Sequence, residues 1–121
     1  MNPLLWLGIA ALGGVGALGR FLLDVTVASR AGRDFPLGTL AVNVSGAFVL
    51  GILLGASLEG DAFLLAGTAT IGSYTTFSTW MLETHRLGED SEWGLALANV
   101  LVSVAVGLAA AALGRALGGL L

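Results

Sequence analysis

The chain contains no cysteine and no lysine, and charged residues make up only 11% of its 121 positions. Without cysteine it has no disulfide framework, no thiolate chemistry and no cysteine metal site. Its five basic residues are all arginine, and the formal net charge is −3. The sequence therefore offers no basic patch for binding nucleic acid.

Side chains for catalysis are equally scarce. The apolar segments contain no pair of carboxylates, no Ser/His/Asp arrangement and no metal-ligand spacing. His85 is the only histidine, and we expect it to be a solvated loop residue rather than a metal ligand or a general base. The sequence predicts that this protein is not an enzyme.

Apolar residues dominate instead: 56% of the chain is hydrophobic and its mean hydropathy is +0.93. Charges divide the chain into four apolar windows, namely Met1–Gly19, Phe35–Leu58, Ala62–Leu82 and Trp93–Gly114. Each holds about the 20 residues that a helix needs to cross a bilayer. We predict a single all-α domain with four transmembrane helices, at about residues 3–27, 37–58, 62–84 and 93–117. The first window lacks the basic start of a signal peptide, so we expect it to be retained.

Glycines in the first helix form the spacing G-x-G-x-x-G at Gly14, Gly16 and Gly19. A dinucleotide site requires a preceding strand and a polar crevice, and an apolar helix provides neither. These small residues are better explained by close approach of another helix. Gly51-Ile-Leu-Leu-Gly55 is a second close-packing pattern, in the second helix.

The third window contains Gly72-Ser-Tyr-Thr-Thr-Phe-Ser-Thr-Trp80, in which six residues carry hydroxyl groups. Glycine and β-branched threonine both weaken a helix. Non-helical backbone at membrane depth is tolerated only where it is buried in protein or lines a polar cavity. We therefore predict that the third helix is broken in mid-membrane at a functional site. The alternative is a Ser/Thr-rich contact between intact helices.

Other neutral polar residues lie within the apolar windows. Thr39 and Asn43 share one face of the second helix, and Asn99 and Ser103 share one face of the fourth. Hydroxyl and amide donors without embedded acids suit an anion or a small polar solute better than a cation. Asn43 is either a donor to such an ion or a hydrogen bond between helices.

Phe77 and Trp80 are three residues apart and project from about the same helix face. Ring edges presented to a pore would favour an anion, and ring faces would favour a cation. Simple packing is the alternative for this pair. Arg20 and Asp24 lie four apart and can pair, and Arg20 either reaches the membrane interface or draws anions toward a vestibule.

Two segments carry a resemblance to a known family. Gly38-Thr-Leu-Ala-Val-Asn-Val-Ser-Gly-Ala-Phe48 and Gly72-Ser-Tyr-Thr-Thr-Phe-Ser-Thr-Trp80 resemble the signature segments of the CrcB/Fluc fluoride channels. Gly13-Gly-Val-Gly-Ala-Leu-Gly-Arg20 resembles that family's first helix. The likeness covers essentially the whole chain.

The resemblance implies an antiparallel, dual-topology homodimer in the cell (plasma or inner) membrane that conducts fluoride passively out of the cytoplasm. It implies a structural Na⁺ at the dimer centre, held by backbone carbonyls of Gly72 and Thr75. It also assigns a set of residues to the fluoride path: Asn43, Phe77, Trp80, Ser78, Thr79, Ser103, Thr39 and Arg20. The partners it implies are fluoride, membrane lipid and a second copy of the chain.

This sequence departs from the family pattern at three positions. Trp80 stands where the family usually has Phe, Asn99 where Tyr is common, and Gly107 where the polar track has a hydroxyl. Dual topology predicts little asymmetry in basic residues between the two sides. The arginines instead show a weak bias, with Arg30, Arg33 and Arg86 on one side against Arg115 on the other, which is in tension with that prediction.

Two other functions are alternatives to the channel. A small proton-coupled drug exporter would need a membrane-embedded carboxylate, and the interiors of the windows contain none. A non-transporting scaffold would use the same polar residues only to join helices.

Overall fold

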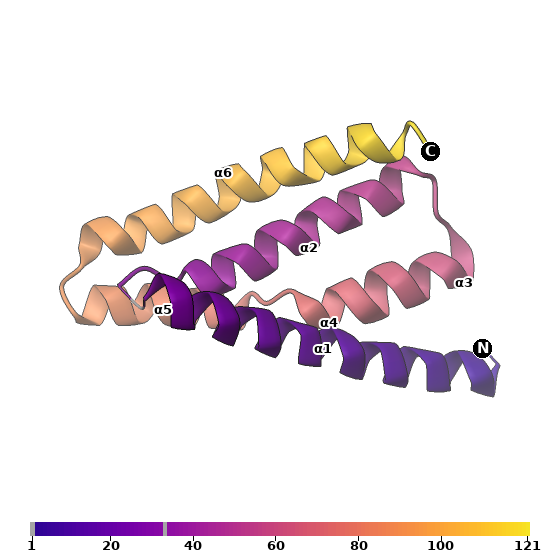
Figure 1. Cartoon of the computed structure of the whole chain (residues 1–121), viewed down its shortest axis with the longest axis horizontal. Coiled ribbons are helices and arrows are strands. Elements are labelled where there is room, and N and C mark those ends of the chain that lie inside the picture. Colours follow the sequence, from indigo (N-terminus) through magenta and orange to yellow (C-terminus); the bar gives the residue numbers. More distant parts are fainter. Residues whose placement is uncertain (1, 33) are drawn as a thin grey trace.

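A computed structural model describes residues 2–32 and 34–121 of the chain. The described residues form helices and loops without any strand (Figure 1). Three helices are long and apolar enough to cross a membrane, namely α1 (Pro3–Ala31), α2 (Leu37–Gly55) and α6 (Trp93–Gly118). The prediction of an all-α membrane protein is confirmed to this extent.

The third predicted helix is a run of shorter pieces. It consists of α3 (Gly60–Phe63), the π-helical segment η1 (Leu64–Ile71), α4 (Gly72–Tyr74) and α5 (Ser78–Glu89). Residues 75–77 between α4 and α5 are not helical, and Thr75 is extended with a ψ of 160°. Figure 1 shows this interruption as a thin stretch of backbone near the middle of the bundle. The predicted bend is present, but Gly72 is itself helical, so the break begins after Tyr74.

Local backbone geometry sets where the helices end. α1 continues past the expected Val27 to Ala31 and stops before Gly32, whose φ of 82° favours glycine. α2 ends at Gly55 rather than at Leu58, and Ser57 follows with a φ of 59°. α5 runs on to Glu89, so His85 is an exposed helical residue, 3.0 Å from the Glu89 carboxylate, and not a loop residue.

α2 and α6 pack closely along their whole length, side by side in Figure 1. A Cβ atom added to Gly51 or Gly55 would collide with the backbone of Ala111 or Arg115. Gly114 on α6 is equally crowded, by the backbone of Phe48. The G-x-x-x-G pattern of α2 therefore serves close packing, as predicted, and its partner is α6 of the same subunit.

The broken helix is held from two sides by further glycines. A Cβ atom on Gly16 of α1 would overlap Ser73 and Thr70, and one on Gly46 of α2 would overlap Thr75. α1 thus approaches the backbone just before the break closely, and α2 leaves room for the Thr75 side chain at the break. Gly14, by contrast, has no neighbour within 4 Å, so only part of the glycine cluster packs inside the subunit.

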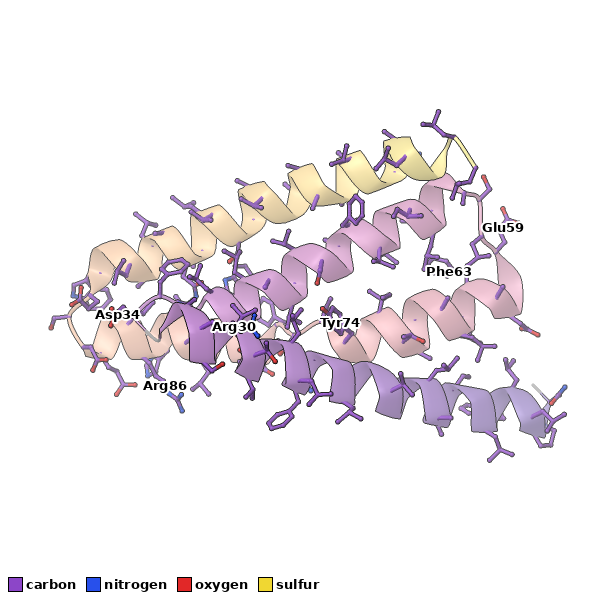
Figure 2. All side chains as sticks on the ribbon, viewed as in Figure 1. Arg30, Asp34, Glu59, Phe63, Tyr74 and Arg86 are labelled. Carbon is purple, nitrogen blue, oxygen red and sulfur yellow. The ribbon has the colours of Figure 1, made fainter. Side chains whose placement is uncertain are left out.

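Charged residues gather at the ends of the bundle. Asp34 and Arg86 lie at one end and Glu59 at the other (Figure 2). Arg33, one of the arginines in the predicted charge bias, lies outside the described residues. Between the ends, many large apolar side chains of α1 and α6 are exposed, including Leu7, Leu18 and Leu108. These surfaces need lipid or another protein surface to cover them.

Candidate functional site

Asn43 of α2 holds the break open through two hydrogen bonds. Its amide Nδ2 donates to the Thr76 carbonyl at 2.8 Å, and its Oδ1 accepts from the Thr76 amide at 2.9 Å. The side chain therefore pairs with the backbone of a single residue in the way a neighbouring peptide would. This pairing satisfies backbone groups that lose their helical partners where the helix is interrupted. Nδ2 carries a second hydrogen that these two bonds do not use.

Carbonyls in the turn before the break lose their usual helical donors, and two of these donors have other acceptors. In a continuous helix the Thr76 amide would donate to Gly72, but here it donates to Asn43. The Thr79 amide would donate to Thr75, but here it donates to the Thr76 hydroxyl at 3.2 Å. The carbonyls of Gly72 and Thr75, which the family resemblance assigns to Na⁺, are among those left without these donors. Backbone carbonyls at a helix break are oxygen ligands that suit such a cation.

Among the described residues, no cluster of histidine and acidic side chains is arranged to hold a metal.

A groove of about 560 Å³ runs along the break between α2 and the broken helix. Five of the predicted site residues line it: Asn43, Gly72, Thr75, Phe77 and Trp80. The Phe77 ring is 71% exposed in the single subunit. Its centroid lies 5.7 Å from that of Trp80, and the rings meet edge to face at 83°. The groove thus joins amide, hydroxyl and aromatic groups on one open surface.

A smaller cavity of about 130 Å³ lies on the other side of the break. Arg20, Thr39 and Thr79, three more of the predicted residues, line it together with Asp24 and Thr76. Thr76 also lines the groove, so this residue separates the two spaces.

Arg20 faces this cavity without the expected partner. The only ion pair among the described residues is His85–Glu89, so Arg20 and Asp24 line one cavity without pairing. The Arg20 Nε atom is buried and has no hydrogen-bond partner. A buried guanidinium donor that is not neutralised by a carboxylate is available to an anion.

The cavity opens toward one end of the bundle. A neighbouring space of about 440 Å³ shares Asp24 and Thr79 with it and is lined by the charged residues Glu83, Arg86 and Asp90. The Thr39 hydroxyl donates to the Glu83 carboxylate, a contact that the sequence analysis did not foresee. The two spaces form a polar recess that leads from the end of the bundle to the break.

Two of the predicted residues line neither the groove nor the small cavity. Ser78 is exposed at the start of α5, with its hydroxyl 3.5 Å from that of Thr76, and Ser103 lies on α6. Thr76, in contrast, was not predicted as a site residue but only as one of the six hydroxyl residues, although its backbone and side chain both bond across the break. The pair of adjacent threonines, Thr75 and Thr76, was the sequence feature that could have indicated its role.

Comparison with known proteins agrees with this geometry. Residues 7–115 match the family model described as "CrcB-like protein, Camphor Resistance (CrcB)". The chain belongs to the CrcB family. Because the match spans almost the whole chain, it covers the break and both cavities.

Several curated relatives of this CrcB chain are ion channels by name. "Fluoride-specific ion channel FluC 2" of Mycolicibacterium paratuberculosis is 60% identical over 93% of this chain and 92% of the relative. The protein of the same name from Mycobacterium bovis is 59% identical over 92% and 88%. "Fluoride-specific ion channel FluC" of Geobacter sulfurreducens is 47% identical over 83% and 85%. The family is one of ion channels and not of enzymes, as the lack of catalytic side chains predicted.

Proposed function

We propose that this protein is a fluoride channel that passively conducts fluoride out of the cytoplasm across the cell (plasma or inner) membrane. The observation that carries the proposal is the broken helix, with Asn43, Phe77 and Trp80 along one groove and Arg20 in a recess behind it. The names of relatives at up to 60% identity support fluoride as the ion. In this proposal α1, α2, the broken helix and α6 each cross the membrane.

The donors around the break suit a small anion. Fluoride must exchange its hydration shell for protein donors when it enters the membrane. The second Nδ2 hydrogen of Asn43 and the positive ring edge of Phe77 are neutral groups that can replace water without holding the ion permanently. Arg20, at the inner end of the polar recess, adds the positive charge that concentrates anions. Ser78, Thr79, Ser103 and Thr39 extend this path as a polar track in the proposal.

The same break would hold a structural Na⁺ through the carbonyls of Gly72 and Thr75. Both carbonyls lack their helical donors, so a cation can complete their coordination at little cost to the helix. The ion would supply positive charge to a segment whose carbonyl dipoles otherwise repel each other.

An antiparallel, dual-topology homodimer accounts for the open groove. The groove is apolar along much of its wall and Phe77 is largely exposed, so a second subunit is needed to enclose an ion path. A twofold axis would bring the breaks of both subunits together and place one shared cation between them. The weak arginine bias, with Arg30 and Arg86 toward one end against Arg115 in the last turn of α6, is compatible with insertion in either direction.

The test is fluoride efflux from liposomes that contain the purified protein, followed with a fluoride electrode. We expect fluoride to leave under a gradient and chloride to be retained. Liposomes that retain fluoride would refute the proposal and favour a scaffold that only joins helices. Repeating the assay and a thermal melt in N-methyl-D-glucamine instead of Na⁺ tests the cation. We expect a lower melting temperature without Na⁺, and an equal one would remove the cation from the proposal.

A further inference from the structure

Asn99 is the most deeply buried polar side chain in the described part of the chain, with 1% of its surface exposed. It lies in α6, which is otherwise built mainly from aliphatic residues and glycine. A buried amide at membrane depth costs free energy unless it is hydrogen bonded. Its side-chain partners come from α5, so this position serves the contact between α5 and α6.

The contact is a circuit of three hydrogen bonds with a longer fourth bond across it. The Asn99 Nδ2 donates to the Thr84 hydroxyl at 2.8 Å, and that hydroxyl donates to the Trp80 carbonyl at 2.9 Å. The Trp80 indole Nε1 donates to the backbone carbonyl of Asn99 at 3.0 Å, and the Asn99 Nδ2 also lies 3.5 Å from the Trp80 carbonyl. In these bonds the amide and indole N–H groups donate, and the hydroxyl both accepts and donates, as their chemistry allows. The circuit ties the Trp80 side chain and the turn of α5 that follows it to one turn of α6.

This circuit decides what Trp80 can offer to an ion. An indole has a single N–H donor, and here it is already bonded to Asn99. What remains free is the ring, which lines the groove beside Asn43 and packs edge to face against Phe77. If its hydrogen bonds to α6 were lost, the indole, which is larger than a phenylalanine ring, would gain rotamer freedom and could turn across the groove.

We propose that Asn99 and Thr84 are positioning residues that form a clamp: their side chains hold the Trp80 backbone against α6, so that the indole stays bonded to the Asn99 backbone carbonyl and Trp80 gives the ion path a fixed ring and not a hydrogen-bond donor. The inference rests on the proposed fluoride conduction. It also places two departures from the family pattern, Trp80 and Asn99, in one contact, in which each side chain bonds the backbone carbonyl of the other residue.

The experiment compares fluoride efflux from liposomes for the full chain and single variants. Thr84→Val removes the hydroxyl and keeps the side-chain shape, and we expect flux to fall about threefold or more, the factor that one average membrane hydrogen bond represents. Asn99→Leu should do the same. Thr84→Ser keeps the hydroxyl and should restore the flux. Thr26→Val is the matched control, because the Thr26 hydroxyl bonds only the Leu22 carbonyl of its own exposed helix, and its flux should be unchanged.

A double-mutant cycle tests whether the clamp acts through the indole. In a Trp80→Phe background there is no N–H to hold, so Thr84→Val should cause no further loss relative to that parent. A second readout does not depend on flux. With Trp6→Phe and Trp93→Phe, Trp80 is the only indole, and Thr84→Val should lower its fluorescence anisotropy while Thr26→Val should not.

Equal flux loss from Thr84→Val with and without Trp80→Phe would overturn the inference, since the hydroxyl would then act independently of the indole. Unchanged anisotropy and flux in Thr84→Val would also overturn it. If the buried Asn99→Leu variant does not fold, as judged by gel filtration, the near-isosteric Thr84→Val carries the test alone. A wild-type protein that passes no fluoride would refute the proposed function, while the anisotropy result would still decide whether the clamp exists.

Discussion

Asn43→Ala is the substitution that probes the break most directly. It removes both hydrogen bonds between the Asn43 amide and the backbone of Thr76 and leaves that N–H and C=O without partners. Two membrane hydrogen bonds of average strength set a lower limit of about 1 kcal/mol. Leaving two buried backbone groups unpaired would set an upper limit of about 6 kcal/mol. Because the site is only part-buried, we expect a loss of about 2–3 kcal/mol in the lower half of this range.

The loss should appear in two measurements. Without Asn43 nothing fixes the backbone of Thr76 at the break, and this would disturb the carbonyls of the proposed Na⁺ site. We therefore expect a lower melting temperature in detergent and a smaller stabilisation by Na⁺. Fluoride efflux should fall at least tenfold, because the same change removes the amide donor from the groove.

The control for Asn43→Ala is another asparagine that bonds to backbone. Asn2 caps α1 by accepting from the amides of Leu4 at 2.6 Å and Leu5 at 3.2 Å. Asn2→Ala should cost about 1 kcal/mol, as for other helix caps, and leave the efflux unchanged. If Asn43→Ala melted and conducted like the wild type, Asn43 would have no role in holding the break, and our reasoning would be refuted.

Three further outcomes follow from the geometry. Phe77→Ile should lower fluoride efflux sharply with little change in the melting temperature of the subunit fold, because the ring is 71% exposed; normal efflux would exclude the ring from the path. Thr76→Val should reduce the shift in melting temperature caused by Na⁺, because the Thr79 amide loses its hydroxyl acceptor. Thr76→Ser retains the hydroxyl and should show the wild-type shift, so equal shifts in the two variants would contradict the role of this hydroxyl. Gly51→Ala should destabilise the protein by about 1–3 kcal/mol, because the added methyl group meets the backbone of Ala111, whereas Gly107→Ala, with open space around it, should not in the same thermal melt.

Several features were predictable from sequence because each depends on composition along a short stretch of chain. Apolar windows without charges predict helices that need lipid, and three of them are single long helices in the structure. Six hydroxyl residues after Gly72 predict an interrupted helix, since that composition is unsuited to a lipid-facing one. The glycines of α2 predict close helix packing, because a helix without Cβ atoms on one face admits another backbone.

The tertiary structure decided which groups meet. Within the predicted stretch Gly72–Trp80 the break is limited to residues 75–77, where a side chain from another helix, Asn43, pairs with the backbone of Thr76. Trp80 and Asn99 appeared in the sequence as two unrelated departures, but they form one hydrogen-bonded contact between α5 and α6. Hydrogen bonds act over about 3 Å and depend on direction, so their partners follow from how helices pack and not from spacing along the chain.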